Sequence, residues 1–271
     1  MFPLSPRLRL LRYAVLAAAG VCLLKVALHR RGWEPLTTNP LVSALVAATV
    51  FLLGFLLSGV LSDYKESERL PGEMGAALQC LAQEVRGVAR TLPDCPVQGA
   101  LAANAALGEA ILAWVQSQDP PSRLQAAFTR LYDELALVAR WNPPPLQARL
   151  LLEVATLQRG VVRIATIRCT AFVPSVYLLA ILSSALLLVG LLLSRSGPLH
   201  EALFFLAILS SLLLLLLNLI ADLDNPFDYG TRRSFENVSL EPLQLAVQHS
   251  LQISRLAPPG PGEPVPVPSP R

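Results

Sequence analysis

The most constraining feature of this sequence is an uncharged apolar run from Leu41 to Leu61, followed almost at once by a dense polar segment from Asp63 to Arg69. A helix rises about 1.5 Å per residue, so the run spans roughly 30 Å, the thickness of the hydrocarbon core of a bilayer. No proline interrupts the chain between Pro40 and Pro71. We therefore expect one helix that crosses a membrane and continues into water.

Three further apolar segments give the chain the composition of a membrane protein. Apolar residues make up 53% of the chain and charged residues 15%, whereas soluble domains contain about 25% charged residues. The expected membrane helices are Tyr13–Leu28, Leu41–Leu61, Thr170–Leu193 and Ala202–Ala221. The sequence thus predicts an all-α membrane protein with four transmembrane helices and a helical cytosolic domain inserted between the second and the third.

The first apolar segment allows an alternative, because a basic stretch before an apolar core is typical of a secretory signal. No A-x-A-like cleavage site follows cleanly, and His29-Arg30-Arg31 ends the segment with charge. A first transmembrane helix is therefore favoured. Lys25 lies near the end of this helix, where we expect its long stem to carry the amine to the membrane interface.

The polar insert has the apolar periodicity of amphipathic helices. They are expected over Met74–Leu92, Ala100–Val115, Leu124–Trp141 and Leu146–Arg168, with a break before them at Pro71-Gly72; another is expected over Leu240–Leu256. The predicted division is residues 1–69 for the first two transmembrane helices, 70–165 for the cytosolic domain, 166–222 for the third and fourth transmembrane helices, 223–256 for a cytosolic C-terminal segment, and 257–271 for a disordered Pro-rich tail.

Basic residues beside the apolar segments set the expected orientation, because they concentrate on the cytosolic side of membrane proteins. Arg30, Arg31 and Arg195 flank one side, whereas the side that carries both termini and the insert has many more. We therefore expect a multi-pass protein of the cell membrane with both termini in the cytosol.

The sequence carries no motif for catalysis or metal binding. Its four cysteines show no C-x-x-C spacing, and its three histidines are far apart. The serine pairs of the membrane segments have no histidine at a matching depth, and no basic run with interleaved aromatics suggests nucleic acid. We expect no enzyme activity, no cofactor, no metal site and no nucleic-acid partner.

Two phenylalanines stand out in the second apolar segment. Phe51 and Phe55 are four residues apart, as are Ala47 and Phe51, so all three share one face of a helix. Aromatic residues at this spacing commonly pack against lipid or a neighbouring helix. If several copies of the helix surround an axis, the same face would line a narrow apolar tube, and the residues alone leave both interpretations open.

Three short motifs together resemble the bestrophin family of anion channels. Phe51-Leu52-Leu53-Gly54-Phe55, with Tyr64 and Glu66 further along, is similar to an aromatic-x-x-Gly-Phe stretch in the family's second helix. Val173-Pro174-Ser175-Val176-Tyr177 is similar to its Ile-Pro-x-Val-Tyr motif, and Asn225-Pro226-Phe227 to its Asn-Pro-Phe motif after the fourth helix. The resemblance covers roughly residues 10–256 in layout, but only about twenty residues in motif.

The resemblance implies a homopentamer in a lipid bilayer that conducts small anions such as chloride through a pore lined by the second helix. Its hydrophobic neck would fall on Ala47, Phe51 and Phe55, with Lys65 and Arg69 at the mouth. The structural motif residues would be Gly54, Tyr64, Glu66, Pro174, Tyr177, Asn225, Pro226 and Phe227.

The sequence departs from the family at three places. Ala47 is smaller than the usual residue, and Tyr64-Lys65 replaces a pair of tryptophans. The acidic run that binds Ca²⁺ in animal members is replaced by the segment from Asp228 to Arg233, so we do not expect Ca²⁺ activation. The alternative function is a non-conducting membrane scaffold that recruits partners through its cytosolic helices and Pro-rich tail.

Overall fold

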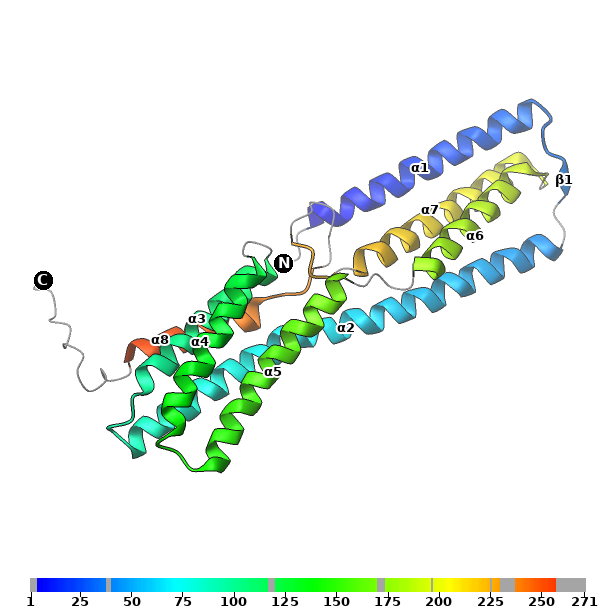
Figure 1. The fold of residues 1–271 in the computed structure, drawn as a ribbon. Coiled ribbons are helices and arrows are strands. Elements are labelled where there is room, and N and C mark those ends of the chain that lie inside the picture. Colours follow the sequence, from blue (N-terminus) through cyan, green and yellow to red (C-terminus); the bar gives the residue numbers. More distant parts are fainter. Residues whose placement is uncertain are drawn as a thin grey trace, which may run out of the picture. The chain divides into compact units, whose positions relative to one another are not determined.

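The computed structural model describes residues 4–37, 40–116, 120–169, 174–195, 197–224, 226–229 and 237–256. These ranges contain eight α-helices and one pair of two-residue strands (Figure 1). The chain is an all-α membrane protein, and four of its helices are long and apolar enough to cross a membrane, as predicted. The contacts divide the chain into a membrane unit, which includes residues 4–65 and 174–226, and a helical domain, which includes residues 66–169.

The membrane unit is built from α1, the first part of α2, α6 and α7. Their bounds are Leu4–Arg30, Pro40–Thr91, Pro174–Leu193 and Leu199–Leu223. The last three share one apolar core, whose buried residues are Leu53, Leu56, Val60, Ala180, Leu187, Leu213, Ile220 and Leu223. Outside this core each of the three helices also carries exposed apolar side chains, among them Phe51, Leu178 and Leu212.

Helix α1 packs alongside α7 (Figure 1). Ala14 and Ala18 are buried and lie four residues apart, so their small side chains form one flat stripe. Cys22 continues the stripe, and its Sγ donates a hydrogen bond to the carbonyl of Leu203 over 3.7 Å. In lipid the hydrophobic effect does not drive helices together, so association depends on close packing. The small side chains allow α1 and α7 to approach closely.

Two short strands close one end of the membrane unit. Strand β1, Leu36–Thr37, pairs in parallel with β2, Ser194–Arg195, with Leu36 opposite Ser194. The pair joins the connection after α1 to the end of α6. We call this the bridge end; it also contains the last turn of α1 and the first turn of α7 (Figure 1).

The helical domain contains the second part of α2 together with α3 (Val97–Val115), α4 (Pro121–Ala139), α5 (Pro144–Cys169) and α8 (Glu241–Leu256). Helices α4 and α5 begin at prolines, whose fixed φ suits a first turn where the missing N–H has no intrahelical partner. The predicted helices of the insert are therefore present, and their prolines mark helix starts.

The predicted break at Pro71-Gly72 is wrong, because α2 continues through Pro71 to Thr91. A proline inside a helix removes one backbone hydrogen bond and typically costs about 3 kcal/mol. Leu70 and Met74 flank the site and are buried, at 7% and 1% exposure. Packing on both sides of the proline thus stabilises a helix that local propensity disfavours.

Helix α8 packs closely on α2 and α3. A Cβ atom at Gly75 would lie 3.1 Å from the carbonyl oxygen of Pro242, and one at Gly108 would lie 2.7 Å from Cγ2 of Val247. A larger residue at either position would therefore force neighbouring atoms of α8 to shift. In the same core, the buried Asn104 donates through Nδ2 to the carbonyl of Leu78 over 3.0 Å, which fixes α3 against α2.

Candidate functional site

The first candidate site is one exposed face of α2. Ala47, Phe51 and Phe55 are all exposed, the two rings by 75% and 69%, whereas Leu53 and Leu56 on the opposite side are almost completely buried. The three predicted neck residues therefore share a face that the rest of the membrane unit does not cover. We call this the Phe face.

The Phe face changes character along the helix. Ser58 and Ser62 follow Phe55 at helical spacing and are exposed, and Lys65 continues the same line. Gly54 lies between the two rings, where a Cβ atom would meet nothing within 4 Å. From its N-terminal to its C-terminal end, this face of α2 thus carries two aromatic rings, then two hydroxyls, then one amine.

The two residues predicted for the mouth differ in their surroundings. Arg69 donates from Nη2 to Oε1 of Glu73 over 2.8 Å, so its charge is balanced by a neighbour one turn along. Lys65 is exposed and has no ion-pair partner among the residues described. Of the two residues, Lys65 is therefore the one whose positive charge is not balanced by a described neighbour.

The aromatic motif residues are packing residues. Tyr64 and Tyr177 are half-buried against the apolar core of the membrane unit. Pro174, which lies near the start of the third apolar segment, begins α6, and Pro226 is buried. Asn225 lies outside the described residues.

Glu66 forms a bidentate ion pair in the helical domain. Arg163 on α5 donates from Nε and Nη2 to the two carboxylate oxygens, over 2.9 and 2.8 Å. These hydrogen bonds lower the pKa of Glu66, and burial opposes them only in part. Glu66 thus ties α2 to α5 within the domain.

Phe227 is completely buried, and its carbonyl is held by Arg168 near the end of α5. The guanidinium also donates to the carbonyls of Trp114 and Val115 at the end of α3, and it lies 5.1 Å from the Trp114 ring centroid. Burial lowers the pKa of Arg168, while Tyr229 and Asp228 counteract the shift. One cation therefore joins three carbonyls from two separate segments.

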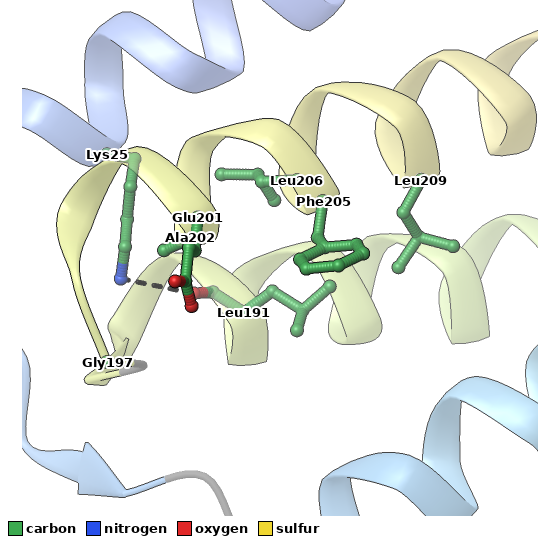
Figure 2. A pocket seen from close by; sticks show the side chains of 8 residues that line it. All are labelled: Lys25, Leu191, Gly197, Glu201, Ala202, Phe205, Leu206 and Leu209. Atoms are coloured by element: carbon green, nitrogen blue, oxygen red, sulfur yellow. Dashed lines mark hydrogen bonds between the residues drawn. The ribbon is translucent and has the colours of Figure 1, made fainter.

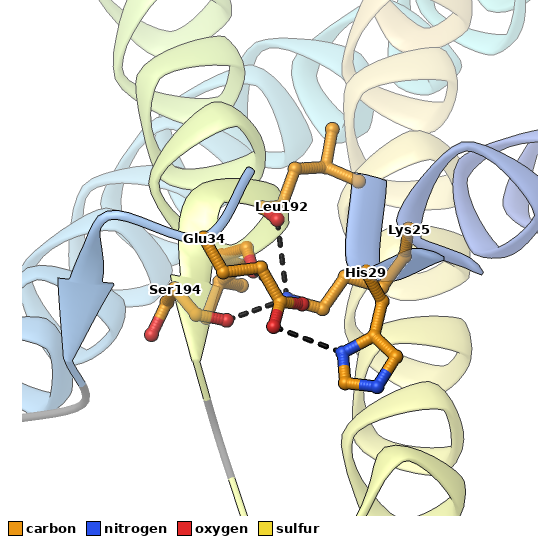
Figure 3. A network of polar contacts seen from close by, with 6 residues as sticks. Lys25, His29, Glu34, Leu192 and Ser194 are labelled. Atoms are coloured by element: carbon orange, nitrogen blue, oxygen red, sulfur yellow. Dashed lines mark hydrogen bonds and ion pairs between the residues drawn. The ribbon is translucent and has the colours of Figure 1, made fainter. Parts of the chain in front are cut away.

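The second candidate site is a buried ion pair at the bridge end (Figure 3). Lys25 Nζ lies 2.9 Å from Oε1 of Glu34, and the two side chains are only 2% and 6% exposed. The amine also donates to the carbonyls of Leu192, over 3.1 Å, and Ser194. The last carbonyls of a helix lack intrahelical partners, so Lys25 caps α6 with charge of the favourable sign.

A tight turn brings Glu34 back to Lys25. Gly32, with φ of 69°, donates to the carbonyl of His29, and Trp33 donates to that of Leu28. This is the Schellman arrangement, and it needs the left-handed backbone that glycine adopts readily. His29 Nδ1 then lies 2.9 Å from Oε2 of Glu34, so the carboxylate is held from both sides.

The Lys25 amine reaches the ends of the membrane helices, but it is buried there and not exposed to water. Its amine is buried because the side chain leaves α1 toward α6, where Glu34 and the helix-end carbonyls replace water (Figure 3). Glu34 lies beyond the span that ends at Arg30, and the hydrogen bond from Lys25 lowers its pKa. The one sequence signal for the turn that brings Glu34 back to Lys25 is Gly32, which follows the basic residues at the end of the first apolar segment.

The fold resembles solved structures of known proteins. No family model matches the chain, and no curated protein matches it significantly. The crystal structure of a single-substitution variant of a bacterial bestrophin homolog from Klebsiella pneumoniae matches with a TM-score of 0.75 and 16% identity, over 90% of this chain and 98% of that chain. A crystal structure of a bacterial bestrophin homolog from Klebsiella pneumoniae solved by Zn-SAD phasing matches with a TM-score of 0.71 and 16% identity, over 93% of this chain and 99% of that chain. The chain has a bestrophin-like fold.

Proposed function

We propose that this protein is an anion channel of the cell membrane whose pore is lined by the Phe face of several copies. The exposure of Phe51 and Phe55, on the side of α2 turned away from its own core, is the observation that carries the proposal. The bestrophin-like fold and the three sequence motifs support it. By that resemblance the assembly is a homopentamer, and the distribution of basic residues favours a cytosolic location for both termini and the helical domain.

A ring of apolar side chains can gate a pore without a moving plug. Water leaves a narrow apolar tube readily, so a small change of radius switches ion conduction. In the proposed pore Phe51 and Phe55 form this neck, and the smaller Ala47 widens one end. Aromatic edges carry partial positive charge, so rings tilted inward favour a weakly hydrated anion.

Lys65 supplies the fixed charge of the proposed mouth. A copy of this exposed amine in each subunit raises the local concentration of anions. Arg69 contributes less, because Glu73 neutralises it at 2.8 Å. The exposed hydroxyls of Ser58 and Ser62 lie between the amine and the rings and offer hydrogen-bond donors to a passing anion.

Reconstitution into a planar bilayer tests the proposal. Under a salt gradient we expect the reversal potential to move toward the chloride equilibrium potential, and permeability to rise from chloride to bromide to nitrate because larger anions lose water more easily. Equal permeability of Na⁺ and chloride would contradict anion selectivity. A silent protein whose mass in detergent corresponds to one copy of 29.2 kDa would favour the scaffold alternative.

A further inference from the structure

A cavity at the bridge end lies outside the proposed pore face. It has a volume of about 220 Å³ and is bounded by residues of α1, α6 and α7 (Figure 2). That is more than the roughly 10–15 Å³ that one water needs and less than the 300 Å³ or more of typical drug-sized pockets. The cavity therefore has room for one end of an amphiphilic molecule.

The wall of the cavity is mainly apolar. Leu191 comes from α6, and Phe205, Leu206 and Leu209 come from α7 (Figure 2). Leu206 is 4% exposed and forms the deep part, whereas Phe205 is 67% exposed. Much of the Phe205 ring is thus accessible beside the cavity, and the face of an aromatic ring attracts cations.

The charges around the cavity favour a cationic ligand. Lys25 borders it, but its amine is already neutralised by Glu34 and bound by carbonyls at the end of α6. Glu201 also borders it, is exposed, and forms no ion pair with another described residue. One uncompensated carboxylate therefore lies beside an apolar wall. The carboxylate repels an anionic head group and attracts a cationic one.

A carboxylate in the first turn of a helix is stabilised by the helix dipole and needs no ligand. Glu201 is the third residue of α7, and Glu241, the first residue of α8, also lies in a first turn. The helix dipole explains the carboxylate but not the cavity beside it. The cavity and its apolar wall are therefore a second observation, independent of the helix end. Glu241 is accordingly the matched control for Glu201.

We propose that this cavity binds an amphiphile with an ammonium head and an apolar chain, the head on Glu201 and Phe205 and the chain against Leu191, Leu206 and Leu209. Two sources share this chemistry: an amine-bearing membrane lipid, such as phosphatidylethanolamine, and a free alkylammonium compound. The inference does not depend on ion conduction, so its experiment is independent of the test of the channel proposal.

Photocrosslinking of the full-length protein in nanodiscs tests the inference. The probe is a decyltrimethylammonium that carries a diazirine in its chain, compared with the matching neutral alcohol, and labelled peptides are mapped by mass spectrometry. We expect the cationic probe to label residues 202–209, and Glu201→Gln to reduce that labelling at least fivefold. Glu241→Gln should leave it unchanged. Equal labelling by the neutral probe, or undiminished labelling in Glu201→Gln, would overturn the inference.

A second variant tests the cavity itself. Ala202 borders the cavity, so Ala202→Leu should reduce labelling by filling it, whereas Ala221→Leu on an exposed part of α7 should not. Labelling that persists in a correctly assembled Ala202→Leu protein would also overturn the inference. Competition by phosphatidylethanolamine in the nanodisc identifies a lipid as the source, and competition by soluble decyltrimethylammonium alone identifies a free amphiphile.

Discussion

Lys25 Nζ and the carboxylate of Glu34 lie 2.9 Å apart, with both side chains almost completely buried at the bridge end. The pair fastens the turn after α1 to the carbonyls at the end of α6 (Figure 3). Desolvation of two charges offsets much of their attraction, so the pair adds little net stability compared with an apolar substitute. Its main effect is to specify which helix ends meet.

Removal of one partner should be strongly destabilising, because the other charge then remains buried and unpaired. We expect Lys25→Met to lower the free energy of unfolding by about 3–5 kcal/mol, measured by denaturation in detergent. The double variant Lys25→Met/Glu34→Gln should recover part of this loss. Arg69→Met breaks an exposed pair of similar length and should cost under about 1 kcal/mol. Equal effects of the two single variants would contradict the account.

The same pair predicts how stability depends on pH. The hydrogen bond from Lys25 holds the pKa of Glu34 below its ordinary value of about 4.3. A carboxyl with a lowered pKa stabilises the folded state above its unfolded-state pKa, and this contribution is lost as pH falls through the folded-state pKa. Melting temperatures measured from pH 6 to pH 3 should therefore fall more steeply in the wild type than in Glu34→Gln. Parallel curves would argue against the charged pair.

Arg168 should not tolerate lysine, although the charge would be kept. Its planar guanidinium donates hydrogen bonds to the carbonyls of Trp114, Val115 and Phe227. A lysine amine is more compact and cannot span the three carbonyls in the same way. We expect Arg168→Lys to lower the free energy of unfolding by about 1–3 kcal/mol. Arg159→Lys, on an exposed position of the same helix, should change it by less than about 0.5 kcal/mol.

In the proposed channel, Lys65 and Arg69 should differ in their effect on selectivity. Lys65→Gln should lower the permeability ratio of chloride to Na⁺ severalfold, because it removes an exposed charge with no ion-pair partner among the described residues. Arg69→Gln should change the ratio less, since Glu73 already balances that guanidinium. Reversal potentials of both variants at low ionic strength, where screening is weakest, provide the measurement. A larger effect of Arg69→Gln would show that Lys65 is not the dominant charge.

Local patterns predicted the four membrane helices and the shared helix face of Ala47, Phe51 and Phe55. The length of each apolar run determines whether a helix can span a bilayer, and a spacing of four residues determines which side chains share a face. Three other features depend on tertiary contacts. Pro71 stays inside α2 because Leu70 and Met74 are buried, Lys25 is buried because Gly32 turns Glu34 back toward it, and Arg168 meets carbonyls more than fifty residues away in sequence.

The most direct test of the central claim is a planar-bilayer recording of Phe51→Ala/Phe55→Ala beside the wild type. Phe204→Ala/Ile208→Ala is the matched control, because those side chains lie four residues apart on α7, are exposed at 61% and 44%, and do not line the proposed cavity. If the Phe face lines a pore, the α2 double variant should show anion currents several times larger than the wild type, because a wider and less apolar neck is easier to hydrate. The control should conduct like the wild type. Equal currents from both double variants, in assemblies of the same size, would mean that Phe51 and Phe55 face lipid and that α2 does not form the pore neck.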